Sequence, residues 1–239
     1  MSFECVSRTH VGLRRKINED SLFAQPERGL WVVADGMGGH DAGEVASNMV
    51  TDALRCLPPT AGLEELAAAA AEALQRVHRE LVKLAASGGR ANSRAIGTTV
   101  VGLGIENGAY CCFWAGDSRA YLLRDGEIRR VSRDHSVVQN LVDAGMLLPE
   151  EAETHVNANL ITRAVGVGDK LDVDIVRGDV HPGDQFVLVS DGLTRVVCDL
   201  ELAAELKQGQ LAQVADRLID TVLSRGAPDN VSLIIVKVL

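Results

Sequence analysis

Aspartates follow apolar runs at several points of the sequence, where buried strands are expected to end. The segments WVVADG and VLVSDG contain Asp35 and Asp191, and each aspartate is followed by a glycine that permits a tight turn. Asp117 ends a third apolar run, and Asp229 stands just before the last one. One aspartate at a strand end is an ordinary turn residue. Several of them meeting at one sheet edge would raise one another's pKa, and a bound cation would relieve that repulsion.

The residue types at these positions narrow the cation that they could bind. Carboxylate oxygens suit the hard ions Mg²⁺ and Mn²⁺, whereas zinc is more often held by nitrogen or sulfur. Two such ions about 3.5–4 Å apart can share a hydroxide and hold a phosphoryl group for in-line attack. Arg15 precedes the acidic pair Glu19 and Asp20 and could bind a phosphate through two hydrogen bonds. The spacing favours metal-dependent phosphate hydrolysis and leaves ordinary turn aspartates as the alternative.

The elements that must position these residues are strands in consecutive groups and helices in pairs. Strands are predicted at 30–34, 98–105, 109–114, 120–123, 128–131, 186–190 and 231–238, and residues 172–176 are expected to begin a further, polar-edged strand. Asp125 and Gly126 form the turn of a predicted hairpin. Helices are predicted at 41–57, 63–85, 136–144, 200–206 and 211–224. This order predicts an α+β fold with mostly antiparallel sheets under helix pairs, in a single domain over residues 1–239.

Apolar residues three and four apart define the buried faces expected of the two longer helices near the N-terminus. The helix at 41–57 is expected to begin with a capping box of Asp41 and Glu44. Its apolar face would consist of Val45, Met49, Val50, Ala53, Leu54 and Leu57. The stripe of the helix at 63–85 would run from Leu63 through Leu66, Ala70, Leu74, Val77 and Leu81 to Leu84.

The composition excludes several classes of protein. Of the 239 residues, 46% are hydrophobic and 24% are charged, so the chain can form a core and is not expected to be disordered. The net charge of −9 argues against a nucleic-acid binder, which needs a cationic surface. The five cysteines form no CxxC pair, which is typical of the reducing cytoplasm. The longest apolar run, residues 109–115, is too short for insertion into a membrane.

Five short motifs occur in order along the chain, namely RKINED, DGMGGH, GDSR, SDG and DN. Together they resemble the PPM/PP2C family of metal-dependent protein serine/threonine phosphatases, in its compact bacterial form. The resemblance runs from about Thr9 to the C-terminus. It implies an αββα sandwich, in which helix pairs cover two antiparallel sheets, and this agrees with the α+β class expected from the order of elements.

The resemblance also implies two core ions, Mn²⁺ or Mg²⁺, and leaves open whether a third ion binds. Asp35 would bridge both core ions, and Gly36 would add its backbone carbonyl. Asp191 and Asp229 would hold the first ion, directly or through water.

Further roles follow from the same resemblance. Asp20, with Glu19 as an additional candidate, would support the second ion, and Asp117 would join Asp191 at the third, looser position. Arg15 would hold the phosphate of the substrate. Asn230 would support the neighbouring ligand rather than bind an ion itself.

One position departs from a pattern common in eukaryotic members, which often have a histidine as general acid where this chain has Met37. Because methionine has no proton to donate, the acid would be a metal-bound water or His40. Residues 135–159 correspond to the variable flap beside the site, which is expected to influence which phosphoprotein binds.

The activity implied is hydrolysis of phosphoserine and phosphothreonine in proteins by attack of a metal-bridging hydroxide. Phosphorylated proteins would be the partners, in particular a serine/threonine kinase or its targets, and the location would be the cytoplasm. The alternative is a catalytically inactive regulatory module that binds phosphoproteins without hydrolysing them. Such a module would be expected to have lost metal ligands, whereas the five candidate aspartates are all present.

Overall fold

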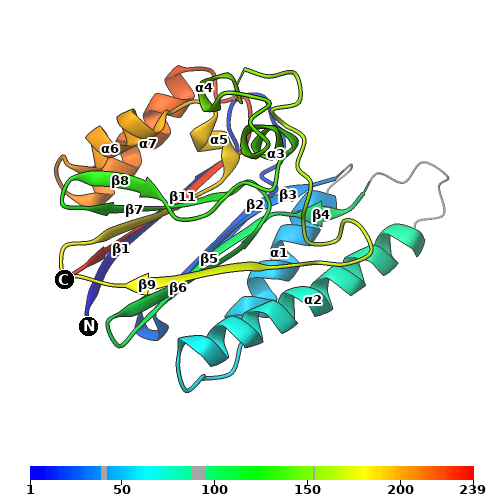
Figure 1. Cartoon of the computed structure of the whole chain (residues 1–239), viewed down its shortest axis with the longest axis horizontal. Coiled ribbons are helices and arrows are strands. Elements are labelled where there is room, and N and C mark those ends of the chain that lie inside the picture. The colour runs from blue at the N-terminus through cyan, green and yellow to red at the C-terminus, as the bar shows by residue number, and fades with distance from the viewer. Residues whose placement is uncertain (39–41, 88–94, 153) are drawn as a thin grey trace.

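Most strands of this chain carry apolar side chains on both faces, and the structure buries both. A computed structural model describes residues 1–38, 42–87, 95–152 and 154–239. Two antiparallel sheets pack face to face, and helices cover the outer face of each (Figure 1). The αββα sandwich and the α+β class predicted from the sequence are therefore confirmed.

The two sheets have these strands. The first has the order β1 (Phe3–His10), β11 (Val231–Val238), β10 (Gln185–Val189), β7 (Arg119–Arg124) and β8 (Glu127–Arg130). The second has the order β2 (Asp20–Gln25), β3 (Leu30–Met37), β5 (Val100–Glu106), β6 (Ala109–Ala115) and β9 (Asp174–Asp179), and β4 (Gly97–Thr98) pairs with the end of β3. The helices are η1 (Pro26–Arg28), α1 (Ala42–Arg55), α2 (Leu63–Ser87), α3 (Val137–Asp143), α4 (Pro149–Ala152), α5 (Asp191–Thr194), α6 (Asp199–Leu206) and α7 (Leu211–Ser224).

Strand β3 shows how the sandwich uses a continuous apolar run. Leu30, Val32 and Ala34 pack toward α1 and α2, while Trp31 and Val33 lie in the core between the sheets. Side chains alternate between the two faces of a strand, so a strand covered on both faces needs apolar residues at every position. Strand β10 follows the same rule in the first sheet.

Helix α1 covers the second sheet with a face that differs from the predicted one. The buried stripe passes through Ala46, Val50 and Leu54, which are four residues apart. Val45 is 45% exposed, because it lies one position away from this stripe, and its predicted burial was wrong. The expected N-cap of this helix, Asp41, lies outside the described residues.

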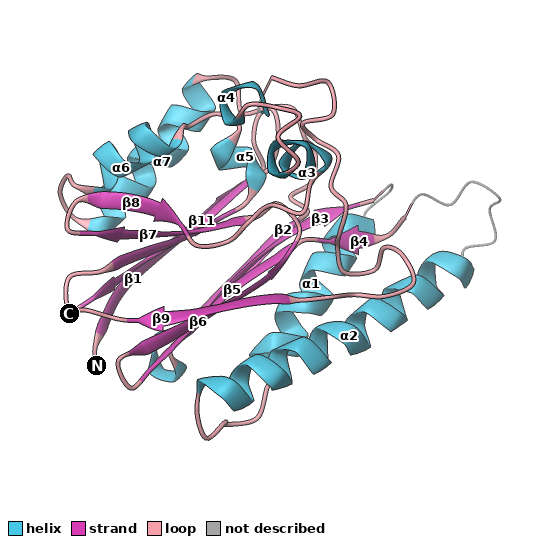
Figure 2. Ribbon diagram, in the orientation of Figure 1, coloured by secondary structure: helices cyan, strands magenta, loops and turns pink. Residues whose placement is uncertain are grey.

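Helix α2 buries most of its predicted stripe, including Leu66, Leu74 and Leu81. Leu84 is 44% exposed instead, because the last turns of α2 project past the edge of the sheet (Figure 1). On the other side of the sandwich, α6 and α7 cover the first sheet (Figure 2). Among the described residues, no helix has the length and apolar character that a membrane crossing requires.

Two strands, β1 and β2, were not predicted from the sequence. Strand β1 pairs with β11 along its whole length, from Phe3 opposite Val238 to His10 opposite Val231. Both strands lie at sheet edges, where half-buried positions accept polar residues and the apolar pattern is weak. The hairpin predicted at Asp125 and Gly126 is present, and both residues have the positive φ that its turn requires.

We expect Trp31→Ala to lower the free energy of unfolding by about 3–5 kcal/mol, because the side chain is fully buried between the sheets. Its ring packs edge-on against Phe3, with centroids 5.0 Å apart, and so joins the second sheet to the first. Urea unfolding followed by circular dichroism measures the loss. Leu200→Ala is the control, because Leu200 is 81% exposed and its removal should change stability by less than about 0.5 kcal/mol. Equal losses in the two variants would contradict this description of the core.

Candidate metal centre

The sequence-predicted aspartates come from separate elements that end at the same place in the sandwich. The pairing of β2 with β3 sets Asp20 directly opposite Asp35. Asp191 begins α5 at the end of β10, and Asp117 lies in the turn from β6 to β7. Asp229 lies just before β11, next to β10 in the first sheet. The structure therefore brings all five of them together between the two sheets.

The carboxyls lie close enough to raise one another's pKa. Burial raises the pKa of Asp35 well above its usual range, and the charges of Asp20, Asp191, Asp117 and Asp229 raise it further. Burial is also the main reason why the pKa of Asp20 and that of Asp117 each rise to about 7. The pKa of Asp191 is raised by burial as well. Such a group of carboxyls needs protons or cations to be stable.

Backbone contacts hold Asp35 at the end of β3. Its carbonyl accepts hydrogen bonds from the Thr99 amide (2.8 Å) and the Thr98 hydroxyl (2.9 Å), and its amide donates to the Thr99 hydroxyl (3.1 Å). The Thr99 hydroxyl also hydrogen-bonds the Ser118 hydroxyl (2.6 Å), next to Asp117. This arrangement fixes Asp35 through its main chain.

Gly36 is a position where only glycine fits. A Cβ added there would lie 2.1 Å from the Gly43 carbonyl oxygen and 2.5 Å from that of Glu19. The Gly36 amide donates to the Glu19 carbonyl (3.1 Å), and the Gly43 amide donates to the Glu19 carboxylate (3.1 Å). Glu19 thus joins β3 to the first turn of α1, and this contact engages one of its carboxylate oxygens.

Asp20 is oriented by the neighbouring sheet. The Ser190 hydroxyl donates to Asp20 Oδ2 (2.9 Å), and the Ser232 amide donates in turn to the Ser190 oxygen (2.9 Å). Asp20 Oδ1 is buried and has no hydrogen-bond partner in the structure. The same is true of Asp191 Oδ1. A cation site that is described without its ion is expected to contain buried carboxylate oxygens that have no hydrogen-bond partner. These two oxygens fit that expectation.

Two arginines contact the outer carboxylate oxygens of the site. Arg15 Nη2 donates to Asp229 Oδ2 (2.8 Å), and Arg15 is half exposed. Arg195 Nη2 contacts Asp191 Oδ2, and its Nη1 lies 3.9 Å from Asp229 Oδ2. The pKa of Arg15 is raised, first by its hydrogen bond to Asp229 and then by nearby carboxylates that include Asp35. The predicted phosphate-binding residue therefore lies at the rim of the aspartate group.

Asn230 holds the loop that carries Arg15. Its side-chain amide donates to the carbonyls of Val11 (2.8 Å) and Ile17 (2.9 Å), and its side-chain oxygen accepts from the Glu19 amide (2.8 Å). Asn230 is buried, so these three bonds replace the water that its amide would otherwise bind. The supporting position predicted for Asn230 agrees with these contacts.

The residues present fit a site for hard divalent cations. All the side-chain donors are carboxylate oxygens, as Mg²⁺ and Mn²⁺ prefer, and two of these oxygens are buried without a partner. No group of three or more His, Cys, Asp or Glu side chains within the described ranges is already arranged to hold an ion. Arg15 contacts Asp229 Oδ2 and Arg195 contacts Asp191 Oδ2. An ion would bind as those contacts rearrange.

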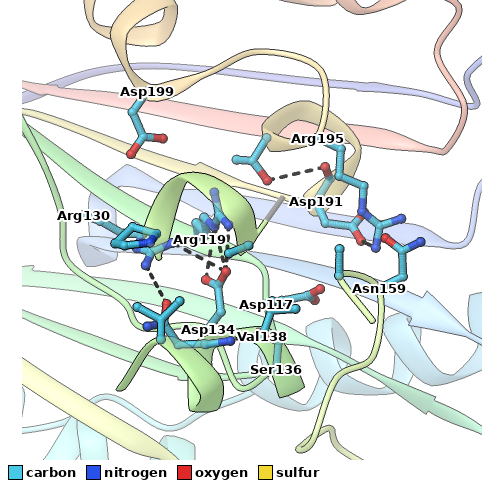
Figure 3. A pocket seen from close by; sticks show the side chains of 16 residues that line it. Asp117, Arg119, Arg130, Asp134, Ser136, Val138, Asn159, Asp191, Arg195 and Asp199 are labelled. Carbon is cyan, nitrogen blue, oxygen red and sulfur yellow. Dashed lines mark hydrogen bonds and ion pairs between the residues drawn. The ribbon is translucent and has the colours of Figure 1, made fainter. Parts of the chain in front are cut away.

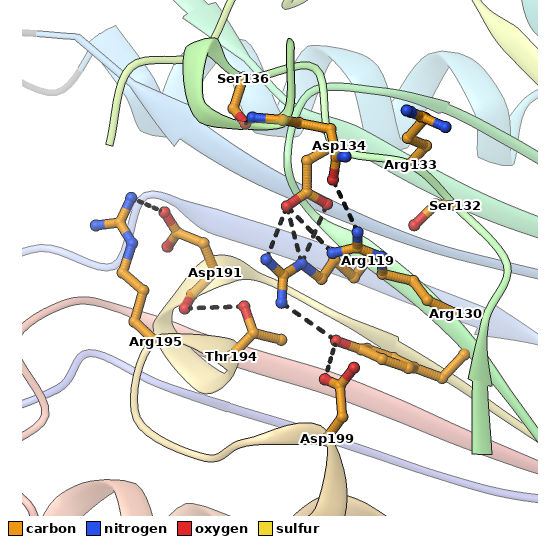
Figure 4. A network of polar contacts seen from close by, with 12 residues as sticks. Arg119, Arg130, Ser132, Arg133, Asp134, Ser136, Asp191, Thr194, Arg195 and Asp199 are labelled. Carbon is orange, nitrogen blue, oxygen red and sulfur yellow. Dashed lines mark hydrogen bonds and ion pairs between the residues drawn. The ribbon is translucent and has the colours of Figure 1, made fainter. Parts of the chain in front are cut away.

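Sequence reasoning missed a second polar group beside the aspartates. Arg119, at the start of β7, makes a bidentate ion pair with Asp134, whose nearest oxygen is 2.7 Å away, and its Nη1 lies 3.4 Å from the Tyr121 hydroxyl (Figure 4). His135 Nδ1 accepts from the Gly116 amide (3.1 Å), and the His135 amide donates to the Gly116 carbonyl (2.9 Å). The polar run that follows β8 is the sequence feature that could have indicated this group, because Asp134 and His135 are adjacent in it. Together they fix the turn that holds Asp117.

Residues 135–159, the predicted flap, include α3 and α4 and form one wall of a pocket of about 500 Å³. Asp117 and Asp191 also line this pocket (Figure 3). Met37 lies at the end of β3, with its methyl group beside Gly97. His40, the alternative proton donor, lies outside the described residues.

Comparisons with known proteins agree with the sequence motifs. The family model for protein phosphatase 2C matches residues 10–233. The serine/threonine protein phosphatase PstP of Mycobacterium tuberculosis is 36% identical over 233 residues, which cover 98% of this chain but only 44% of that protein. The chain thus spans less than half the length of this curated relative.

Solved structures resemble the whole chain. PppA, a key regulatory component of the T6SS in Pseudomonas aeruginosa, is 39% identical with a TM-score of 0.91, over 100% of this chain and 99% of that one. The catalytic domain of the phosphatase PstP in complex with two manganese ions is 35% identical with a TM-score of 0.85, over 98% and 97% of the chains.

We expect protonation of the buried carboxyls to stabilise the metal-free protein as the pH falls. The pKa of Asp20 and that of Asp117 rise from 3.8 to about 7 on folding, so between those values the folded protein holds protons that the unfolded chain has released. Its free energy of unfolding should therefore increase from about pH 8 to about pH 5 relative to an Asp20→Asn/Asp117→Asn variant, which lacks these carboxyls. The measurement is the unfolding temperature of both proteins in EDTA. Parallel pH profiles would show that the two carboxyls are not perturbed.

Proposed function

Since the chain belongs to the protein phosphatase 2C family, we propose that it hydrolyses phosphoserine and phosphothreonine in proteins with two bound divalent cations, Mn²⁺ or Mg²⁺. The observation that carries this proposal is the group of five aspartates, with two buried and unpartnered oxygens, beside a half-exposed arginine. The manganese-bound relative supports the choice of cation.

Each aspartate would have its own role in binding the ions. The charges of the other four carboxyls all act on Asp35, which is the candidate bridging ligand, while Asp191 and Asp229 would hold one ion and Asp20 the other. Bound ions would supply the nucleophile by lowering the pKa of water and would stabilise the charge on the phosphoryl oxygens. Because Asp35 is fixed through its backbone, its carboxyl can keep one position while substrates enter and leave.

Arg15 would bind the phosphate under this proposal. Its guanidinium lies at the rim, close to Asp229 and within the field of Asp35, and a planar guanidinium can bind two phosphate oxygens at once. Asn230 ties the loop of Arg15 to the strand that follows Asp229, so the binding group and the ligands keep a fixed separation. The proton for the leaving serine or threonine oxygen would come from water or from His40, because Met37 carries none.

The proposal extends to the partners of this protein and to its location in the cell. Phosphorylated proteins are the substrates under this proposal, with a serine/threonine kinase or its targets among them. The wall of α3 and α4 next to the site is where such a protein would make contact. The five cysteines are free thiols, which fits the reducing cytoplasm as the place of action.

The proposal is tested by adding Mn²⁺ to the purified protein with a phosphoserine peptide and measuring released phosphate. We expect turnover that depends on Mn²⁺ and falls at least about 100-fold in Asp35→Asn, since the variant loses the bridging carboxylate. Asp216→Asn is the control, because Asp216 lies on the exposed side of α7 and pairs with Arg8. A wild-type protein that binds the phosphopeptide but releases no phosphate would favour the inactive binding module instead.

A second prediction concerns Arg15. We expect Arg15→Ala to raise KM for the phosphopeptide by about 10-fold with a smaller change in kcat, because phosphate binding contributes to the ground state and the transition state alike. Arg15→Lys should be intermediate, as lysine keeps the charge but not the paired hydrogen bonds. Arg14→Ala is the matched control from the same loop. A large fall in kcat at unchanged KM would contradict the binding role.

A further inference from the structure

The pocket beside the aspartates extends beyond the candidate metal ligands. Its volume of about 500 Å³ falls within the range of sites that enclose a whole small molecule, so it has room for more than a phosphate group. Asp117 and Asp191 line it together with residues of the flap and with Asp199, the first residue of α6 (Figure 3). A phosphoprotein bound at the aspartates can therefore place a neighbouring side chain in this pocket.

The flap gives the pocket an apolar wall. Val138 and Val142 of α3 and Pro149 and Ala152 of α4 line it, and none of these side chains carries a polar atom. Such a wall stabilises the aliphatic part of a ligand by removing its surface from water. The wall does not distinguish a leucine from the methylene stem of a lysine, so the choice between them falls to the charged residues of the pocket.

The arginines that line the pocket already have carboxylate partners. Arg119 forms a bidentate ion pair with Asp134, and Arg130 lies 3.5 Å from the same carboxylate. Arg195 contacts Asp191. A carboxylate of a ligand would have to compete with these internal partners, which disfavours an acidic side chain in the pocket.

Asp199 is different, because it has no cationic partner. Within the described part of the chain it forms no ion pair, and its side-chain partner is the Tyr121 hydroxyl, which donates to Oδ1 (2.8 Å). Burial raises the pKa of Tyr121, so this partner stays uncharged. Asp199 is exposed, and Figure 3 shows its carboxylate directed toward the other lining side chains. Its Oδ2 can accept hydrogen bonds from a cationic ligand.

A lysine or arginine side chain matches this arrangement. Its aliphatic stem can pack on the wall of α3 and α4 while its charged end pairs with Asp199, as long cationic side chains commonly do. A glutamate would bring a second negative charge close to Asp199. A leucine would use the wall and leave the carboxylate without a partner. Only a basic side chain uses both features of the pocket.

We propose that this pocket binds a lysine or arginine of the substrate that is close in sequence to the phosphoserine or phosphothreonine, and that Asp199 selects it. The inference rests on the proposed phosphatase function and adds the substrate class, which is phosphoproteins with a basic residue near the phosphorylated one. Asp199 is a specificity-determining residue in this role, because it contacts the bound protein away from the reacting atoms.

The test compares phosphoserine peptides that differ at one residue, which is lysine, norleucine or glutamate. This residue is placed in turn at each of the three positions on either side of the phosphoserine. Norleucine keeps most of the lysine stem without its charge. With Mn²⁺ present, we expect kcat/KM of the wild type to be about 5-fold higher for lysine than for norleucine at one or more positions, and lowest for glutamate.

Three variants locate the selecting residue. Asp199→Asn keeps the size of the side chain and should bring the ratio of kcat/KM between the lysine and norleucine peptides to about 1. Asp199→Lys should reverse the order, so that the glutamate peptide is preferred to the lysine peptide. Asp220→Asn is the matched control, because it removes one negative charge from α7 outside the pocket, and it should keep the wild-type ratio.

The outcomes separate this inference from the function on which it rests. A lysine preference that persists in Asp199→Asn would overturn the inference, and so would a wild-type kcat/KM that is equal or lower for lysine than for norleucine at every position. A wild-type protein that releases no phosphate from any peptide would overturn the proposed function as well. Because Asp199 is exposed, its substitution should leave the fold intact, and circular dichroism checks this.

Discussion

The site depends on bringing five carboxyls close together, most of them buried, against their mutual repulsion. Burying charge without a partner is among the most costly steps in folding, so such a group persists only where other forces fix its members. Here the main chain does most of the fixing. Asp20 and Asp35 face each other because β2 and β3 pair in that register, and hydroxyls of Thr98 and Thr99 hold the backbone of Asp35. The apolar core between the sheets provides the stability that makes this possible.

The need to balance the carboxylate charges explains why two arginines lie at the edge of the aspartate group. The inner oxygens of Asp20 and Asp191 have no protein partner, whereas the outer oxygens of Asp191 and Asp229 contact arginines. The centre is therefore open to cations inside and bordered by guanidinium groups outside. With two divalent ions bound, the five carboxylates and two arginines would sum to about one positive charge, although the chain as a whole has a net charge of −9. A negatively charged protein can in this way attract a dianionic phosphate.

Much of the fold could be predicted from local patterns, and the failures have physical reasons. Strands buried on both faces and helices with one apolar stripe repeat on a short period, so β3, β10, α2 and α7 were found close to their true bounds. Strands β1 and β2 were missed because an edge strand needs no continuous apolar run. Val45 was misplaced because neighbouring stripes on one helix differ by a single residue, and only the position of the sheet decides between them.

The sequence by itself determined the residue types and the order of the motifs. These are carboxylates, which hard cations prefer, and an arginine, whose guanidinium can bind phosphate. The sequence could not show that Arg195 turns back onto Asp191 and Asp229, or that Asn230 clamps the loop of Arg15. Those partners lie up to 219 residues apart in the chain. Only the packing of two sheets brings them within a few ångströms, and charge interactions of this kind depend on distance and burial rather than on sequence order.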